Sequence, residues 1–226
     1  MKDLIIIGAS GHGKVVADIA LRLVQYQYIR FLDDDGAIKE CMGFPVVGTI
    51  GQAERYISGS DIFVAVGNAR ARQKITERLT GLGAEVPILV HPAASVGFGV
   101  EMGCGTVVMA GTVINTGSRI GSGCIINTCS SIDHDCRIGD YVHVSVGAHL
   151  AGGVTVGAEA WIGAGATISN NVSIVRECVI GAGAVVISDI KEEGTYIGVP
   201  ARKSNKDKKG RMAAGRPAKP IKFIKK

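Results

Sequence analysis

The sequence has few aromatic residues, no paired cysteines and no long apolar run. Tyr, Phe and Trp make up 5% of the 226 residues, too few to suggest stacking on bases, and we expect no nucleic-acid partner. The six Cys form no Cys-x-x-Cys pair, which argues against a zinc ribbon or a disulfide framework and indicates a reducing compartment. The sequence has no run of about 18 apolar residues, so it predicts no transmembrane helix. The apolar start Leu4–Ile7 is too short for a signal peptide, so we expect a cytoplasmic protein.

Basic residues are concentrated at the C-terminal end. Residues 202–226 hold 11 of the 25 Lys and Arg and one of the 20 acids, Asp207, so the preceding residues hold 14 bases and 19 acids. This segment has few aliphatic residues and no periodicity, which predicts a disordered tail. Its charge allows weak attraction to an anionic membrane. The preceding part of the chain is mildly acidic.

A repeat of six residues is the strongest pattern in the chain. Sixteen consecutive hexapeptides run from Val96 to Lys191, and each begins with an aliphatic residue. The fifth position is nearly always small, and Gly is frequent at the second. A period of six fits a prism in which each hexapeptide forms one short strand and one corner. Three hexapeptides then make one coil, and residues 18 apart stack at about 4.8 Å. The repeat resembles the left-handed parallel β-helix of hexapeptide acyltransferases, which we expect over residues 93–201.

Residues 1–92 alternate between predicted strands and helices. We expect strands over Leu4–Ile7, Ile29–Leu32, Asp61–Val66 and Glu85–Val90, with helices after the first and third. This order predicts an α/β Rossmann-like domain with a parallel sheet. Ligands bind at the carboxyl ends of such strands. A domain of this size suits a mononucleotide or a nucleotide sugar better than a dinucleotide.

The turn after the first strand is a near match to a phosphate-binding P-loop. It runs from Gly8 to Lys14, but Val15 follows where a P-loop needs Ser or Thr to hold magnesium. The sequence therefore argues against nucleotide hydrolysis and favours binding of a nucleotide group.

The order of these parts resembles one family, the nucleotide-aminosugar N-acetyltransferases and sialic acid O-acetyltransferases, and within it the UDP-N-acetylbacillosamine branch. The likeness extends from Lys2 to about Arg202. The segments that carry it are Gly8-Ala9-Ser10-Gly11-His12-Gly13, Phe31-Leu32-Asp33-Asp34, Val66-Gly67-Asn68, Ile132-Asp133-His134-Asp135, His143-Val144-Ser145 and Gly198-Val199-Pro200-Ala201-Arg202. The resemblance implies acetyl-CoA-dependent acetylation of the 4-amino group of a nucleotide-linked 4-amino-6-deoxy sugar for glycan biosynthesis. It also implies a homotrimer with active sites between subunits, and no metal.

The resemblance also implies a role for individual residues. His134 is the expected general base, and Asp135, which stands where the nearest members have Glu, is expected to orient it. The residues expected at the nucleotide sugar are Ser10, Gly11, His12, Asp33, Asp34 and Gly67, and those expected at acetyl-CoA are His143, Ala164 and Ala182. From the repeat itself, Gly152 stacks on His134 and leaves a slot beside the imidazole and an N–H for the oxyanion.

Three other functions stay open at this point. One is O-acetylation of a sialic acid by the same base. A second is a γ-type carbonic anhydrase, with zinc held by His134, His143 and His149 of neighbouring subunits. The third is a non-catalytic binder of nucleotide sugars. The sequence does not distinguish UDP, GDP and dTDP as the carrier nucleotide.

Overall fold

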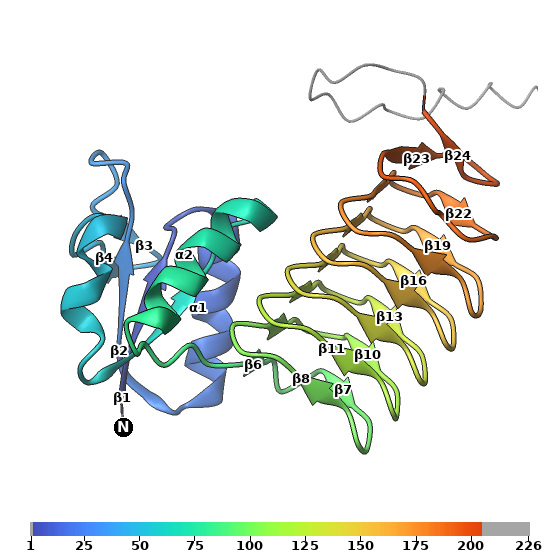
Figure 1. Cartoon of the computed structure of the whole chain (residues 1–226). Helices are drawn as coiled ribbons and strands as arrows, with labels where there is room; N and C mark the ends of the chain where they lie inside the picture. The colour runs from blue at the N-terminus through green and yellow to red at the C-terminus, as the bar shows by residue number, and fades with distance from the viewer. Residues whose placement is uncertain (1, 205–226) are drawn as a thin grey trace, which may run out of the picture.

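A computed structural model describes residues 2–204, and in it an α/β domain precedes a β-solenoid, as predicted (Figure 1). The α/β domain has a parallel sheet in the order β2-β1-β5. Its elements are β1 (Lys2–Ile7), α1 (Gly11–Leu23), β2 (Tyr26–Leu32), β3 (Glu40–Cys41), β4 (Phe44–Pro45), the 3₁₀ helix η1 (Ile50–Tyr56), β5 (Ser60–Val64) and α2 (Ala69–Gly81). No helix within residues 2–204 is long and apolar enough to cross a membrane.

The solenoid has three sheets, one for each side of the prism. The eight-stranded sheet contains β24 (Arg202–Lys203), β23 (Thr195–Ile197), β21 (Val179–Ile180), β18 (Trp161–Ile162), β15 (His143–Val144), β12 (Ile125–Ile126), β9 (Val107–Val108) and β6 (Leu89–Val90). The six-stranded sheet contains β22 (Val185–Val186), β19 (Thr167–Ile168), β16 (His149–Leu150), β13 (Ser131–Ile132), β10 (Val113–Ile114) and β7 (Ser95–Val96). The five-stranded sheet contains β20 (Ser173–Ile174), β17 (Thr155–Val156), β14 (Arg137–Ile138), β11 (Arg119–Ile120) and β8 (Glu101–Met102).

The register confirms the predicted coil of three hexapeptides. Ile114 pairs with Ile132, and Ile132 pairs with Leu150, each 18 residues further along. The aliphatic residues that begin the hexapeptides from Ile114 onward are buried and form one continuous core. Burial of this column supplies the hydrophobic driving force for a segment whose strands are only two residues long.

Each coil turns three corners, and the residue at every corner has a positive φ. Most of these residues are Gly, but six are not: Cys129, Asp135, Tyr141, Glu159, Asn171 and Glu177, with φ between 54° and 60°. We name the corners by one member each. The Asp135 corner lies between the six- and five-stranded sheets, the Tyr141 corner (with Glu159 and Glu177) between the five- and eight-stranded sheets, and the Gly165 corner between the eight- and six-stranded sheets. This backbone conformation is uncommon for residues other than Gly.

The strand predicted over Glu85–Val90 does not join the α/β sheet, so this part of the prediction was wrong. Glu85 makes an isolated bridge to Asp61, whereas β6 pairs with β9 of the solenoid. Pro87 lies between them and has no N–H to donate to a ladder. The solenoid therefore begins at β6, before the expected boundary at residue 93.

The C-terminal end differs from the expected boundary as well. Arg202–Lys203 pairs antiparallel with β23, so the folded part includes residues that we assigned to the tail. The rest of that predicted tail, residues 205–226, lies outside the described residues.

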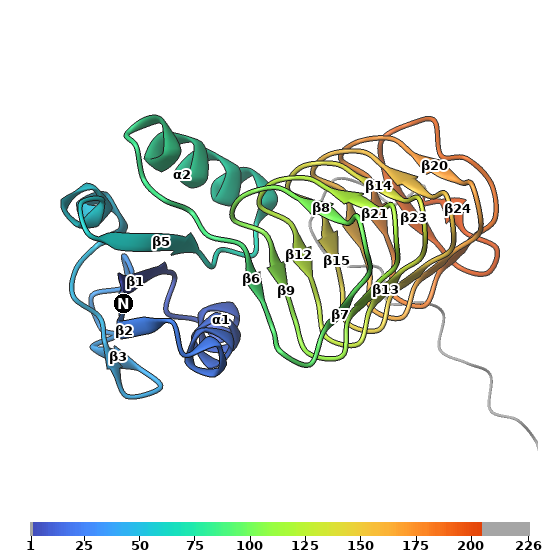
Figure 2. The same ribbon diagram turned by 90° about the horizontal axis from the view of Figure 1, so that it is seen from below.

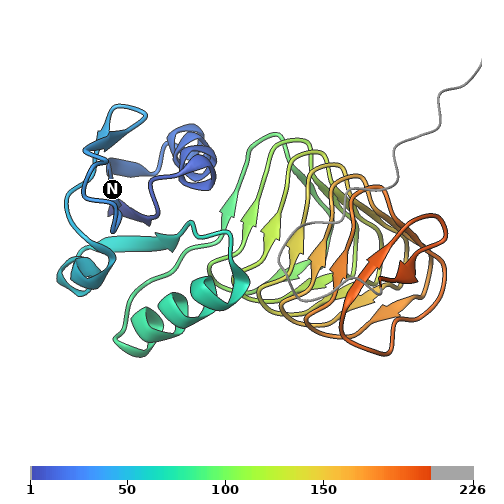
Figure 3. The same cartoon turned by 90° about the horizontal axis from the view of Figure 1, so that it is seen from above.

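The α/β domain packs on the eight-stranded sheet, with α1 beside β6 and β9 (Figure 2). Val107 and Ile125 of that sheet belong to the same buried cluster as Val16 of α1 and Phe31 of β2. The N-terminal end of α2 points at the solenoid (Figure 3), where Arg70 forms ion pairs with two members of the Tyr141 corner. The two domains therefore share a core.

Candidate functional site

His134 and Asp135 form a hydrogen-bonded pair on an exposed corner. The imidazole Nδ1 lies 2.8 Å from Oδ2 of Asp135, so the shorter acid does reach the ring. Asp135 has the positive φ of its corner, 58°. The hydrogen bond that Asp135 accepts from the ring raises the pKa of His134, and the charge of Asp133 raises it further. With Nδ1 held by the carboxylate, Nε2 is the nitrogen that is free to accept a proton.

Asp133 is a third member of this group that the sequence reasoning missed. Its Oδ1 accepts hydrogen bonds from Asn115 Nδ2 at 2.7 Å and from the backbone N–H of His134 at 2.8 Å. These bonds lower the pKa of Asp133, which keeps it ionised. Its place next to His134 was a signal that could have found it.

The imidazole of His134 occupies the slot that we expected Gly152 to leave open. A β-carbon at position 152 would stand 2.6 Å from Nε2 and 2.7 Å from Cε1 of the ring. Gly is required there because the ring lies over its α-carbon. Gly152 is buried beneath the ring, and within residues 2–204 its N–H has no hydrogen-bond acceptor.

The predicted nucleotide-sugar residues lie together at one edge of the α/β sheet. Ile7 is level with Leu32 of β2 and with Val64 of β5, so the turns that follow these strands meet. Ser10 is the N-cap residue of α1 but makes no side-chain cap, and Gly11, like Ser10, is exposed. Gly67 is exposed after β5. A Gly-rich turn beside a helix start is suited to an anion such as a diphosphate.

The two acids after β2 have different partners. Asp33 accepts hydrogen bonds from the N–H groups of Ala9 (2.7 Å) and Asp35 (2.9 Å), so its carboxylate holds the Gly-rich turn in place. Asp34 Oδ1 accepts one from the N–H of Ile50, and its side chain is exposed. Asp34 is therefore the acid with an oxygen left for a ligand, and Asp33 supports the turn.

His143 lies on the eight-stranded sheet, and a hydrogen-bond chain determines its tautomer. The side-chain oxygen of Asn127 accepts from the N–H of Thr128 at 2.8 Å, so its amide nitrogen faces His143 Nε2 at 3.2 Å. Nε2 must accept, which puts the proton of the neutral ring on Nδ1. That Nδ1 is buried and has no partner. Asn127 was missed because nothing in its local sequence marks it.

His12 and His143 lie close enough to interact electrostatically across the two domains. Nε2 of His12, like Nδ1 of His143, is a buried nitrogen without a partner. Burial lowers the pKa of each ring to about 4, and the charge of Arg72 contributes to both shifts. His12 lowers the pKa of His143 in addition. Both rings are therefore neutral at physiological pH, and each offers a nitrogen to a polar ligand.

The remaining predicted residues extend this surface along the solenoid. Trp161 stacks on His143 with ring centroids 5.1 Å apart and planes inclined by 20°. Ala164 and Ala182 are exposed at the Gly165 corner and follow one another in successive coils, since the N–H of Gly183 donates to the carbonyl of Ala164. Such a strip of small residues leaves room for an extended arm.

A cavity of about 270 Å³ lies between the start of α2 and the solenoid. Gly67 and Asn68 line it on one side, and Tyr141, His143 and Trp161 on the other. It joins the predicted nucleotide-sugar turn to the predicted acetyl-CoA residue His143.

Comparison with known proteins identifies the family. The family model of the PglD N-terminal domain matches residues 3–79. The acetyltransferase domain of PglB from Neisseria gonorrhoeae FA1090, solved in complex with acetyl coenzyme A, is 43% identical, with a TM-score of 0.87 over 90% of this chain and 99% of that chain. This chain belongs to the PglD-type nucleotide-sugar N-acetyltransferases. It is an acetyltransferase that uses acetyl-CoA.

Two further relatives support the assignment to the PglD-type family. PerB from Caulobacter crescentus, solved with CoA and GDP-perosamine, is 37% identical, with a TM-score of 0.85 over 90% of this chain and 98% of that chain. The UDP-N-acetylbacillosamine N-acetyltransferase of Bacillus subtilis (strain 168) is 38% identical over 116 residues, which is 49% of this chain and 52% of that protein.

A single chain of this PglD-type enzyme divides its candidate site into two parts. His12, Gly67 and His143 lie on the side of the eight-stranded sheet, which the α/β domain covers. His134 lies at the Asp135 corner, which adjoins only the other two sheets. The fold therefore separates the predicted base from the predicted substrate residues of the same chain.

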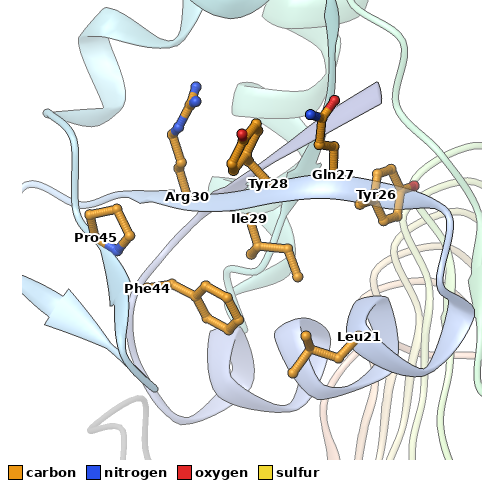
Figure 4. Close-up of a pocket in the computed structure, with 8 residues that line it drawn as sticks. All are labelled: Leu21, Tyr26, Gln27, Tyr28, Ile29, Arg30, Phe44 and Pro45. Carbon is orange, nitrogen blue, oxygen red and sulfur yellow. The ribbon is translucent and has the colours of Figure 1, made fainter. Parts of the chain in front are cut away.

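A second pocket, of about 230 Å³, lies on the α/β domain of the PglD-type enzyme away from these residues. Leu21, Ile29 and Phe44 point toward one another on one side of β2, and Tyr28 and Arg30 stand on the other side (Figure 4). It contains no carboxylate or imidazole, and none of the predicted site residues lines it.

Proposed function

We propose that this enzyme transfers the acetyl group of acetyl-CoA to the 4-amino group of a nucleotide-linked 4-amino-6-deoxy sugar, in glycan biosynthesis. The observation that carries the proposal is the His134–Asp135 pair, with Nδ1 held at 2.8 Å and Nε2 free. The relatives' names support the substrate class, because UDP-N-acetylbacillosamine and GDP-perosamine are both nucleotide-linked amino sugars. The proposal is that the substrate of this enzyme belongs to that class, and it names neither the carrier nucleotide nor the sugar.

The reaction is aminolysis of a thioester. The neutral amine attacks the carbonyl carbon, and the new C–N bond forms as Nε2 of His134 takes a proton from the nitrogen. The tetrahedral intermediate then expels the thiolate of CoA, which takes the proton from the imidazolium and restores the base. Asp135 orients the ring through Nδ1 and stabilises its charged form. No step requires a metal, so activity should persist in a chelator.

Gly152 has a proposed part in the same step. Its N–H has no acceptor within residues 2–204, and it lies beside the ring that acts as base. A backbone N–H placed there can donate to the oxyanion of the tetrahedral intermediate. The absence of a side chain at position 152 leaves room for the His134 ring and leaves the backbone N–H uncovered by a β-carbon.

The active site is completed between subunits of a homotrimer in this proposal. Of the three solenoid sheets, the five-stranded one presents the charged side chains of Glu101, Arg119 and Arg137. The six-stranded one presents Val113, Ser131, His149, Thr167 and Val185, and none of these is a Lys, Arg, Asp or Glu. A sheet surface without charge is the better candidate for subunit contact.

This choice of contact surface brings the two parts of the site together. The six-stranded sheet ends at the Asp135 corner on one side and at the Gly165 corner on the other. When copies pack through this sheet around a threefold axis, His134 of one copy faces the Ala164 and Ala182 side of the next. Acetyl-CoA then lies between neighbouring subunits, with the nucleotide sugar entering from the α/β domain.

The decisive experiment is an acetyl-CoA consumption assay with UDP-, GDP- and dTDP-linked 4-amino-6-deoxy sugars. We expect thiol release with at least one of them, and a product that carries an acetyl group stable to hydroxylamine, as an amide is. A hydroxylamine-labile product from a sialic acid, with no turnover of any amino sugar, would show O-acetylation instead. Binding of the sugars with no thiol release would show a non-catalytic binder.

A further inference from the structure

Arg72 is a buried cation that contacts both domains. Its side chain is 1% exposed, and no carboxylate within residues 2–204 lies within ion-pair distance of its guanidinium. Four hydrogen bonds to backbone carbonyls take the place of a counter-ion. Nη1 donates to Val66 at 2.8 Å and Gly67 at 2.9 Å, Nε to Gly123 at 2.7 Å, and Nη2 to Tyr141 at 2.9 Å.

The two sides of this contact depend on Arg72 to different degrees. On the solenoid, the Tyr141 corner is also held by the ladder, since the N–H of Tyr141 donates to Ser122 at 2.7 Å and its neighbours pair above and below. On the α/β domain, the carbonyls of Val66 and Gly67 have no other hydrogen-bond donor among the described residues. Loss of Arg72 therefore removes one of several hydrogen bonds that hold the Tyr141 corner. On the α/β domain it removes the only hydrogen-bond donor among the described residues to the carbonyls of Val66 and Gly67.

The location of that turn gives the contact a consequence for binding. Gly67 follows β5 at the sheet edge where Ser10 and Asp34 also lie. Asn68 is the N-cap of α2 and accepts from the N–H of Ala71, so the helix side of the turn is fixed separately. Arg72 is one turn further along the same helix and reaches back to the two carbonyls.

We infer that Arg72 is a positioning residue for the nucleotide sugar: it fixes the Gly67 turn in the shape that binds the substrate and holds that turn against the solenoid. This inference rests on the proposed function. A role confined to holding the two domains together would affect both substrates alike. A role in shaping the turn affects the nucleotide sugar and spares acetyl-CoA.

The test uses Arg72→Lys in the full-length enzyme, with UDP, GDP and acetyl-CoA as titrants in calorimetry on one preparation. Lys keeps the charge, but one ammonium group cannot serve carbonyls on both domains as the planar guanidinium does. We expect the nucleotide that binds the native enzyme to bind about tenfold more weakly, while acetyl-CoA affinity changes less than about twofold. In turnover, KM for the sugar should rise and kcat should hold.

Two controls keep the outcomes distinct. Arg78→Lys makes the same change on α2, at an exposed side chain that contacts Ile50 and not the Gly67 turn, and should leave both affinities unchanged. Asn68→Ala loosens the turn without touching the buried cation and should reproduce the selective loss, which covers the case in which Arg72→Lys does not fold. Equal loss for both ligands, or no loss in either turn variant, overturns the inference. A native enzyme that binds neither nucleotide overturns the proposed function itself.

Discussion

The imidazole of His134 lies over the α-carbon of Gly152, so that a β-carbon at position 152 would come within 2.6 Å of Nε2. Gly152 does not need its glycine for a positive φ, because its backbone is in an ordinary conformation. The ring is an exposed side chain that can rotate away, so Gly152→Ala should fold. The ring would then leave the position in which Asp135 holds it.

We predict that Gly152→Ala lowers kcat by about 10- to 100-fold, as expected when a general base is displaced. The melting temperature should change little, because the obstructed group is the movable end of a side chain. Steady-state kinetics and thermal unfolding of the same preparation check both halves. Native turnover in this variant would show that the ring position over Gly152 is not the catalytic one.

Replacement of the proposed base, His134, should have a larger effect. We predict that His134→Ala lowers kcat by about 10² to 10⁴, the usual contribution of a general base, with KM for both substrates nearly unchanged. The side chain is exposed and packs in no core, so the variant should be as stable as the native protein. Retention of more than about a tenth of native turnover would place proton removal elsewhere.

The pH dependence of the rate reports the Asp135 contact. The hydrogen bond that Asp135 accepts raises the pKa of His134, and an imidazole acts as a base only when neutral, so the rate should rise as pH increases through that raised pKa. Asn at position 135 can still accept from Nδ1 but carries no charge. We predict that Asp135→Asn moves the rising limb of kcat to lower pH and lowers the plateau, because a weaker base remains. A limb at the same pH in both proteins would contradict the assignment.

The repeat could be predicted because its signal is local and redundant. An aliphatic residue at every sixth position from Ile114 onward determines which side chains face the core and which residues stack, and the structure has that register. The contact between His134 and Asp135 could also be predicted, because the two residues are neighbours in the sequence. By contrast, the path of Glu85–Val90 depended on whether its end pairs with β5 or with β9, a choice between two distant partners that its own residues do not reveal.

Contacts between the domains could not be predicted for the same reason. Arg72 belongs to a helix with many charged residues, where an Arg is normally solvated, and only the position of the Tyr141 corner makes it a buried donor. The electrostatic interaction of His12 with His143 likewise involves residues from separate domains. The predicted substrate residues were found through family resemblance, and their physical arrangement required the packed structure.

The partly buried imidazoles of His12 and His143 should make the fold sensitive to acid. His12 and His143 have pKa values lowered to about 4, against an ordinary value of 6.5. Between about pH 6.5 and pH 4 these two histidines are protonated in the unfolded chain but mostly neutral in the folded chain. The free energy of unfolding should therefore fall as pH decreases from about 6.5 to about 4. We predict that His143→Gln reduces this pH dependence. Urea unfolding at a series of pH values measures it, and equal slopes for both proteins would show that His143 does not contribute.

A site shared between subunits makes a prediction about mixtures of defective enzymes. His134→Ala lacks the proposed base but keeps the proposed α/β site, whereas Asp34→Ala keeps the proposed base and loses the exposed acid after β2. If the base of one copy serves the nucleotide sugar of the next, mixed trimers contain sites in which an intact base faces an intact α/β domain.

We therefore predict that unfolding and refolding the two variants together restores turnover well above the sum of the separate samples. The assay is made at a sugar concentration below the native KM, where Asp34→Ala is nearly inactive. Refolding each variant alone controls for recovery of mass, and size-exclusion chromatography with light scattering checks that trimers form. If each site were built within one subunit, every site in the mixture would still carry one of the two defects. Turnover of the mixture would then be only the average of the turnovers of the two variants. That result, or a monomeric mass at micromolar protein, would show that each chain works alone.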